Sequence, residues 1–258
     1  MNQILLPSYQ SLLITMKFDG QPLATGTAFV IQKDHVFYLV TNRHNVTGRN
    51  QHDDQPLSNT GGIPNEIEIL HNVECGDNEL RWEPRLEKLL DEDGNPLWHE
   101  HPALGRQADF VALKLRNLQK VKFFPYSLDE MGNMQGIRAP LGISPAKPVS
   151  VVGFPFGIQA GGSLAVWATG FIASELCVDF NELPVFLIDC RARQGQSGSA
   201  VIFHSDSGIP VQGGGTISNG RPFTTLLGIY SGRINSESDL GLVWKTSAIR
   251  ELVDAISI

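Results

Sequence analysis

A serine set between glycines is the first feature of this sequence that could do chemistry. The stretch RQGQSGSAVIF, residues 191–201, places Ser197 between Gly195 and Gly198 and runs directly into an apolar segment. Glycines at this spacing let backbone N–H groups approach a bound oxygen, as an oxyanion hole requires. The serine is therefore either a nucleophile for acyl transfer or an ordinary turn residue. Ser199 occupies the fifth position, so the motif is not the G-x-S-x-G elbow of α/β-hydrolases.

Acyl transfer by serine also needs a base and a carboxylate that orients the base, and the sequence offers a candidate for each role. Among the seven histidines, His44 in FYLVTNRHNVTG directly follows an apolar strand, where a side chain can emerge at the end of a sheet. Asp109 opens the apolar run DFVALKL, where a carboxylate is partly shielded from water. Taken singly, each residue is more simply a structural histidine or an aspartate at the start of a strand.

The elements that must position these residues are short strands. Apolar and β-branched runs separated by turn residues predict antiparallel strands along most of the chain. The first series of runs lies at residues 11–18, 24–32, 35–41, 67–73 and 109–115. A second series begins near residue 147. Two series indicate two β units, residues 1–122 and 147–258, joined by a linker rich in Gly and Pro over 123–146.

One segment interrupts the first series of strands. Residues 74–105 are polar and charged, which favours a surface excursion with a short helix around PRLEKLL, residues 84–90. The HEH sequence at 99–101 is a weak signal for a zinc site, because two histidines in a polar loop are common. The interpretation as a solvated insertion is preferred, and no metal or other cofactor is expected.

The C-terminus carries a helical pattern. Its apolar residues fall at helical spacing at Ile249, Leu252, Val253 and Ile256. Thr246 and Ser247 stand just before them, where either hydroxyl can cap a helix. The pattern predicts a C-terminal amphipathic helix.

Composition excludes several classes of protein. A formal net charge of -7 and a pI near 5.5 argue against nucleic-acid binding, which needs a surplus of Lys and Arg on one face. No stretch reaches the length of a bilayer span, and the N-terminus has no secretory signal. Cys75, Cys177 and Cys190 cannot all pair within the chain, which favours free thiols in a reducing cytoplasm.

Taken together, the motifs resemble the trypsin-like (chymotrypsin-fold) serine peptidases. The segments GTAFVI, LVTNRHNV, DFVALKL and GQSGSAV occur in that family's order of His, Asp and Ser, and the likeness extends from about residue 10 to 250. It is similar above all to the bacterial, HtrA-like branch, which lacks the disulfides of the secreted animal enzymes. The remaining length leaves no room for an additional PDZ domain.

The resemblance implies an all-β fold of two packed antiparallel six-stranded β-barrels, with the active site in the cleft between them. It assigns His44 as general base, Asp109 as the group that orients it and Ser197 as nucleophile. The backbone N–H groups of Gly195 and Ser197 would form the oxyanion hole. The implied activity is that of a serine endopeptidase acting through an acyl-enzyme intermediate on a protein or peptide substrate.

The resemblance also locates a specificity pocket for the side chain before the scissile bond. The expected substrate-binding residues are Arg191, Gln194, Ser231, Gly232 and Arg233, with Gly241 near the floor. Ser231 and Gly232 would pair with the substrate backbone as an added strand. An acidic side chain is preferred if Arg191 or Arg233 points inward, and the alternative is that both arginines lie outside.

Gln196 departs from the family pattern. Animal zymogens carry a carboxylate at the corresponding place, which pairs with a newly cut N-terminal amine, so this chain is not expected to be activated by that ion pair. Control by a separate regulatory protein is the expected replacement. The alternative function is a catalytically silent or partner-locked module that retains the peptidase fold.

Overall fold

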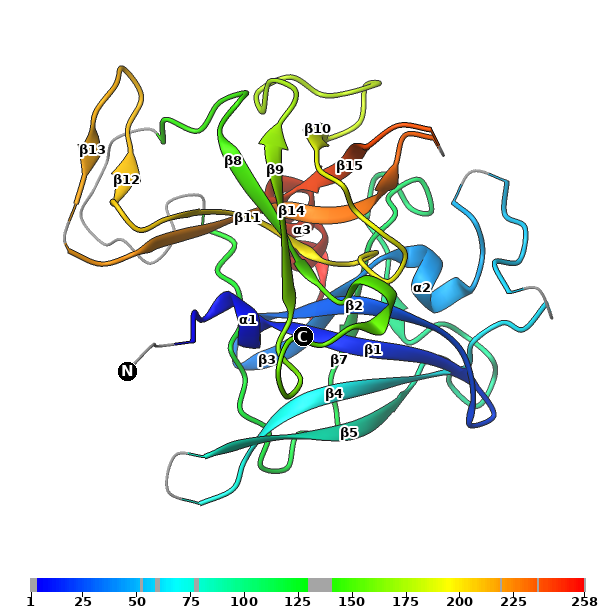
Figure 1. Cartoon of the computed structure of the whole chain (residues 1–258). Coiled ribbons are helices and arrows are strands. Elements are labelled where there is room, and N and C mark those ends of the chain that lie inside the picture. Colours follow the sequence, from blue (N-terminus) through cyan, green and yellow to red (C-terminus); the bar gives the residue numbers. More distant parts are fainter. Residues whose placement is uncertain are drawn as a thin grey trace.

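The computed structural model describes residues 4–51, 53–58, 61–76, 79–129, 141–218, 220–235 and 237–257. Two β units lie one above the other in Figure 1, and the short helix α2 lies near the place where they meet. The middle of the expected linker, residues 130–140, lies outside the described residues.

The first unit is one antiparallel sheet of seven strands in the order β5-β4-β1-β2-β3-β7-β6. Its strands are β1 (Ser11–Phe18), β2 (Gln21–Lys33), β3 (Val36–Thr41), β4 (Glu66–Glu74), β5 (Leu80–Lys88), β6 (Trp98–His99) and β7 (Val111–Lys114). Side chains alternate between the two faces of a strand, and β1 accordingly buries Leu12, Ile14 and Met16 on one face. Every run of the first series therefore forms a strand as predicted. The sheet has one strand more than the expected six.

The helix predicted around residues 84–90 is wrong, because that segment belongs to β5. β5 pairs along its whole length with β4, and Ile69 lies opposite Arg85. The apolar pattern misleads here because Leu86 is exposed, whereas Glu87 is buried. The Glu87 carboxylate accepts the backbone N–H groups of Arg116 and Asn117 at 2.8 and 2.9 Å. These bonds make its burial tolerable.

The second unit is a closed barrel of six strands in the order β10-β15-β14-β11-β8-β9. Its strands are β8 (Pro148–Gly153), β9 (Val166–Ile172), β10 (Val185–Asp189), β11 (Ala200–Ser205), β14 (Phe223–Arg233) and β15 (Leu240–Lys245). Pairing of Ile188 with Ile172 closes the barrel. A small hairpin of β12 (Ile209–Pro210) and β13 (Thr216–Ile217) lies apart from it at the left edge of Figure 1.

Helices are few and short. They are α1 (Pro7–Gln10), α2 (Arg43–Thr47), the 3-10 turn η1 (Pro155–Gly157) and α3 (Thr246–Ala255). α3 confirms the predicted C-terminal helix, but its N-cap is Lys245 and carries no side-chain cap. The Thr246 hydroxyl donates instead to the carbonyl of Leu226 at 3.0 Å. Within the described residues no helix is long and apolar enough to cross a bilayer.

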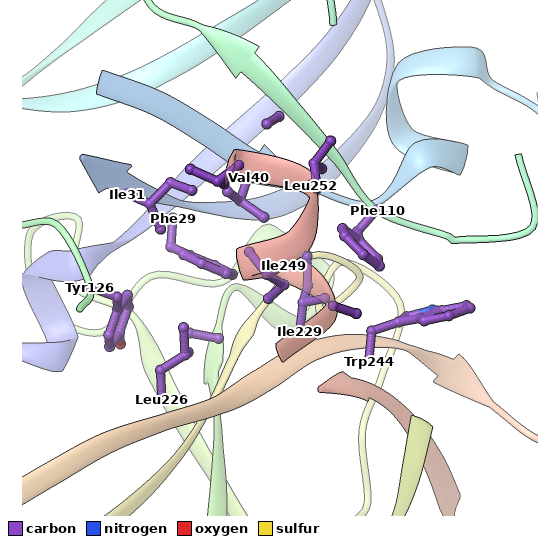
Figure 2. Close-up of a cluster of buried hydrophobic side chains, with 14 of the residues drawn as sticks. Phe29, Ile31, Val40, Phe110, Tyr126, Leu226, Ile229, Trp244, Ile249 and Leu252 are labelled. Carbon is purple, nitrogen blue, oxygen red and sulfur yellow. The ribbon is translucent and has the colours of Figure 1, made fainter. Parts of the chain in front are cut away.

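A shared core fixes the two units against each other. Phe29 and Phe110 from the first unit pack in one cluster with Ile229 and Trp244 from the second, and α3 contributes Ile249. Figure 2 shows the α3 side chains directed into this cluster between strands of both units. Each fully buried side chain of this size stabilises the fold by about 1.5–3 kcal/mol. The shared core therefore fixes the relative position of the two walls of any cleft between the units.

Candidate active site

His44 and Asp109 form a bonded pair at the edge of the first unit. The strand β3 ends at Thr41 and α2 begins at Arg43, which brings His44 next to Asp109, two residues before β7. His44 Nδ1 lies 2.7 Å from Asp109 Oδ2, and the backbone N–H of His44 donates to Asp109 Oδ1 at 3.0 Å. The Asn42 side chain donates to the Asp109 carbonyl at 2.6 Å. Backbone and side chain of the histidine are thus both fixed by one carboxylate.

A third donor to this carboxylate comes from the second unit. Ser231 on β14 donates its hydroxyl to Asp109 Oδ2 at 2.5 Å, although the two residues are 122 positions apart in the chain. Asp109 is only 2% exposed, so these bonds replace its hydration. An acceptor at Nδ1 keeps the proton on that nitrogen and leaves Nε2 of His44 free to act as a base.

The loop that carries Ser197 requires its glycines. Gly195 and Gly198 have φ values of +91° and +86°, a region in which side chains are strained. A Cβ atom at position 198 would collide with the carbonyl oxygen of Thr27, and one at position 195 would lie 2.5 Å from the carbonyl oxygen of Phe154. Both glycines are therefore needed for close packing of the loop against neighbouring backbone.

Backbone N–H groups alternate along this loop between bonded and unbonded. Those of Gln196, Gly198 and Ser199 donate to the carbonyls of Arg193, Tyr230 and Gln196 at 3.1, 3.0 and 2.9 Å. Those of Gly195 and Ser197 donate to no other described residue. Both residues line the cleft between the units. Two neighbouring unbonded donors beside the Ser197 hydroxyl are the arrangement that binds an oxyanion.

Three carbonyl groups of the same loop are bound by other segments. The Gln194 carbonyl accepts the N–H of Phe156 at 2.6 Å. The Gly195 carbonyl accepts the Thr27 hydroxyl at 2.8 Å, and the Ser197 carbonyl accepts the Thr27 N–H at 2.9 Å. Thr27 lies on β2 and is fully buried. The first unit therefore holds the nucleophile loop of the second in the orientation that leaves its N–H groups free.

These groups converge in one cleft of about 1250 Å³, whose walls come from both units. His44, Asp109, Ser197 and Ser231 all line it. No hydrogen bond joins the Ser197 hydroxyl to His44 in the described part of the chain, and such contacts often tighten only when substrate binds. The cleft continues past Ser231 along an apolar wall of Phe180, Leu183, Leu242 and Trp244.

A comparison with known families identifies the family of this chain. The sequence model described as "Trypsin-like peptidase domain" matches residues 26–208, a span that contains His44, Asp109 and Ser197. The chain belongs to the trypsin-like peptidase family. It is a hydrolase of the serine endopeptidase class. A comparison with curated proteins gave no match.

Solved structures of other peptidases share the fold at low sequence identity. An inactive serine-to-alanine mutant of Rv3671c from M. tuberculosis H37Rv is 18% identical, with 97% of this chain and 87% of that chain covered and a TM-score of 0.50. The active form of the Rv3671c protease is also 18% identical, with 97% and 82% covered and a TM-score of 0.51. A serine endoprotease from Yersinia pestis is 14% identical, with 96% and 62% covered and a TM-score of 0.51. These likenesses establish the chymotrypsin-like architecture.

Within this trypsin-like peptidase, Gln196 is a buried member of the nucleophile loop. Its side-chain oxygen accepts the backbone N–H of Arg193 at 2.7 Å, three residues earlier in the same turn. The amide thus braces the loop without a buried charge, so no partner ion is required at this position.

The expected substrate-binding residues fall into two groups. Gln194, Ser231, Gly232 and Arg233 line the cleft of the peptidase. Arg191 does not, because its side chain is 78% exposed and its Nε lies 3.6 Å from Asp239 Oδ2. This placement gives no support to an acidic preference set by Arg191.

The histidines of the HEH sequence do not line the cleft. His101 is buried, and its Nδ1 accepts the backbone N–H groups of Ala103 and Leu104 at 3.3 and 3.2 Å. Burial lowers the pKa of His99, and the nearby Lys114 lowers it further. In the described part of the chain no group of three His, Cys, Asp or Glu residues is placed to hold a metal ion.

Sequence reasoning missed the two residues that join the units at the site. Thr27 and Ser231 make their decisive bonds to residues 168 and 122 positions away, through a threonine and a serine that have no special local pattern. The family resemblance assigns Ser231 to substrate binding alone. The available signal for Thr27 was its place in GTAFVI, directly after a glycine that packs against Asn45.

Proposed function

We propose that this chain hydrolyses internal peptide bonds through a Ser197-His44-Asp109 triad and an acyl-enzyme intermediate. The observation that carries the proposal is the 2.7 Å contact between Asp109 Oδ2 and His44 Nδ1 in the same cleft as Ser197. The two unbonded N–H groups of Gly195 and Ser197 supply the remaining requirement of acyl transfer.

The chemistry follows from these positions. His44 Nε2 takes the proton of the Ser197 hydroxyl as its oxygen attacks the scissile carbonyl, and the Gly195 and Ser197 N–H groups stabilise the oxyanion that forms. Protonated His44 then gives the proton to the leaving amine, which breaks the C–N bond and leaves an ester on Ser197. Water, deprotonated by His44, releases the acid product and restores the serine. Asp109 stabilises the imidazolium in both halves of the reaction.

A fluorophosphonate probe tests the proposal directly. The wild-type chain should be labelled at neutral pH, and Ser197→Ala should abolish labelling. Ser199→Ala is the matched control, because Ser199 is buried two residues away and does not line the cleft. Its labelling should match that of the wild type.

Two results would count against the proposal. Labelling that persists in Ser197→Ala would assign the reactive group elsewhere. Absence of labelling in the wild type would favour the catalytically silent or partner-locked module.

A further inference from the structure

The space between the two segments expected to form the specificity pocket holds a tyrosine. Tyr230 precedes Ser231 on β14 and is only 3% exposed. Its ring packs so closely on β15 that a Cβ atom at position 241 would lie 2.6 Å from Tyr230 Cε2. Gly241, the expected floor of the pocket, is therefore covered by the Tyr230 ring.

Residues of the segment before the nucleophile belong to the same buried cluster as this ring. Tyr230 belongs to one buried cluster with Cys190 and Ala192 from that segment and with Ile188 and Val243 from neighbouring strands. Gln194, Ser231 and Gly232 line the cleft, whereas Ala192, Tyr230 and Gly241 are absent from its described lining. The described lining of the cleft therefore does not reach the expected floor of the pocket at Gly241.

The backbone of Tyr230 is also bonded to the nucleophile loop. The Tyr230 N–H donates to the carbonyl of Ser199 at 2.9 Å, and the Tyr230 carbonyl accepts the N–H of Gly198 at 3.0 Å. A shift of Tyr230 would therefore disturb the loop that carries Ser197. Burial raises the pKa of the Tyr230 hydroxyl, so the group stays neutral at physiological pH.

We infer that Tyr230 fills the pocket for the side chain before the scissile bond and restricts cleavage to positions after small residues such as Gly, Ala and Ser. This inference rests on the proposed peptidase function. Larger side chains would have to displace a packed ring, and overfilling of a packed interior is costly. A small side chain needs no such displacement.

The charged groups nearby make an acidic preference the natural rival. Arg191 and Arg193 lie 3.6 and 3.8 Å from the carboxylate of Asp239, which offsets part of their charge. Neither of these arginines lines the cleft, whereas Arg233 does, so Arg233 is the guanidinium that an acidic side chain could reach. The reactivity of the Asp probe below tests that rival.

Peptidyl phosphonate diphenyl esters that differ only in the residue at the reactive position test the inference, because they label the serine as substrates do. We expect the wild-type chain to react with the Ala probe at least about tenfold faster than with the Leu, Phe or Asp probe. A Leu, Phe or Asp probe that reacts as fast as the Ala probe would overturn the inference.

Variants at Tyr230 supply the second readout. Tyr230→Val should raise the ratio of Leu to Ala labelling by about tenfold, and Tyr230→Phe should leave that ratio unchanged. Phe203→Val is the matched control, because it removes a buried aromatic ring from β11 of the same barrel outside the Tyr230 cluster. The ratio of Leu to Ala labelling is measured on one preparation of each variant, so the fraction of folded protein cancels. An unchanged ratio in folded Tyr230→Val would contradict the inference, and the wild-type profile decides it if that variant does not fold.

Failure of the inference and failure of the proposed function can be told apart. A chain that reacts with the fluorophosphonate but shows no preference for the Ala probe is a serine peptidase whose pocket is not closed by Tyr230. A chain that reacts with neither kind of probe overturns both statements.

Discussion

Two carboxylates, one inside the active cleft and one outside its lining, have different surroundings. In the cleft, Asp109 is 2% exposed and bonds to His44 at 2.7 Å, with Ser231 as a further donor. Outside it, Asp239 is 43% exposed and lies 3.6 Å from Arg191, which is itself 78% exposed. The first carboxylate has its hydration replaced by fixed donors, whereas the second forms an ion pair that is open to solvent. Burial therefore fixes the orientation of the catalytic pair. The exposed pair does not fix the direction of its side chains.

The largest effect should follow from changing the buried carboxylate. Asp109→Asn keeps the shape of the side chain but places an amide where His44 needs an acceptor. We expect kcat to fall by about 10⁴-fold with the fold retained, as measured by peptide hydrolysis and circular dichroism. Asp239→Asn is the matched exposed control and should change kcat by less than about threefold. A fall in kcat of less than tenfold in Asp109→Asn would show that Asp109 does not orient His44 as the catalytic base.

A buried histidine without a carboxylate partner sharpens the comparison. Burial, with a smaller effect of Arg85, lowers the pKa of His71 to about 4 from 6.5. The unfolded chain therefore binds a proton here before the folded chain does, and stability is lost as pH falls from about 6.5 to about 4. The free energy of unfolding should drop by about 3 kcal/mol from this group over that window.

Urea unfolding at several pH values measures this loss. His71→Phe should flatten the dependence between pH 6.5 and 4, and His35→Gln, at an exposed histidine, should leave it unchanged. Equal slopes in the wild type and in His71→Phe would contradict the assignment.

The contact between the units predicts the next effect. Thr27→Val removes the hydroxyl that binds the Gly195 carbonyl and accepts the Phe154 N–H at 3.0 Å. The Gly195 carbonyl belongs to the peptide that joins Gly195 to Gln196, between the two oxyanion donors, so its release should misplace the N–H groups of Gly195 and Ser197. We expect kcat to fall by about 10–100-fold with little change in KM. Thr27→Ser should restore most of the activity, since it keeps the hydroxyl. A rise in KM with kcat unchanged would argue against a positioning role for Thr27. A failure of Thr27→Ser to restore activity would do the same.

The smallest effect on activity and stability should come from the exposed pair of Arg191 and Asp239. Arg191→Gln breaks only a solvent-screened pair, so the free energy of unfolding should change by less than about 0.5 kcal/mol. Cleavage of an Ala-containing peptide should be unaffected within about twofold. A selective loss of cleavage after Asp or Glu in this variant would show that Arg191 does contact substrate.

Much of the fold could be predicted from alternation of apolar residues, because one face of each strand is buried. The strand over Ser11–Phe18 and the helix over Thr246–Ala255 follow that rule. β5 breaks it, since Glu87 is buried and satisfied by two backbone N–H groups from a distant turn. No local pattern encodes such a partner.

The candidate site divides in the same way. His44, Asp109 and Ser197 could be predicted from their residue types, their positions beside strands and a family resemblance. Thr27 and the Asp109 bond of Ser231 could not, because they depend on how two units dock. The direction of Arg191 was not predictable either, because the sequence of a loop does not specify where an exposed side chain points.

The account's central claim is that Ser197 is acylated during turnover. Intact-mass and peptide-mapping spectrometry after mixing with a slowly hydrolysed Ala peptide ester measures this directly. We predict one acyl adduct on the peptide that contains Ser197, absent in Ser197→Ala and strongly reduced in His44→Ala. An adduct on Cys75 or Cys177, or none while the ester is still hydrolysed, would contradict the claim.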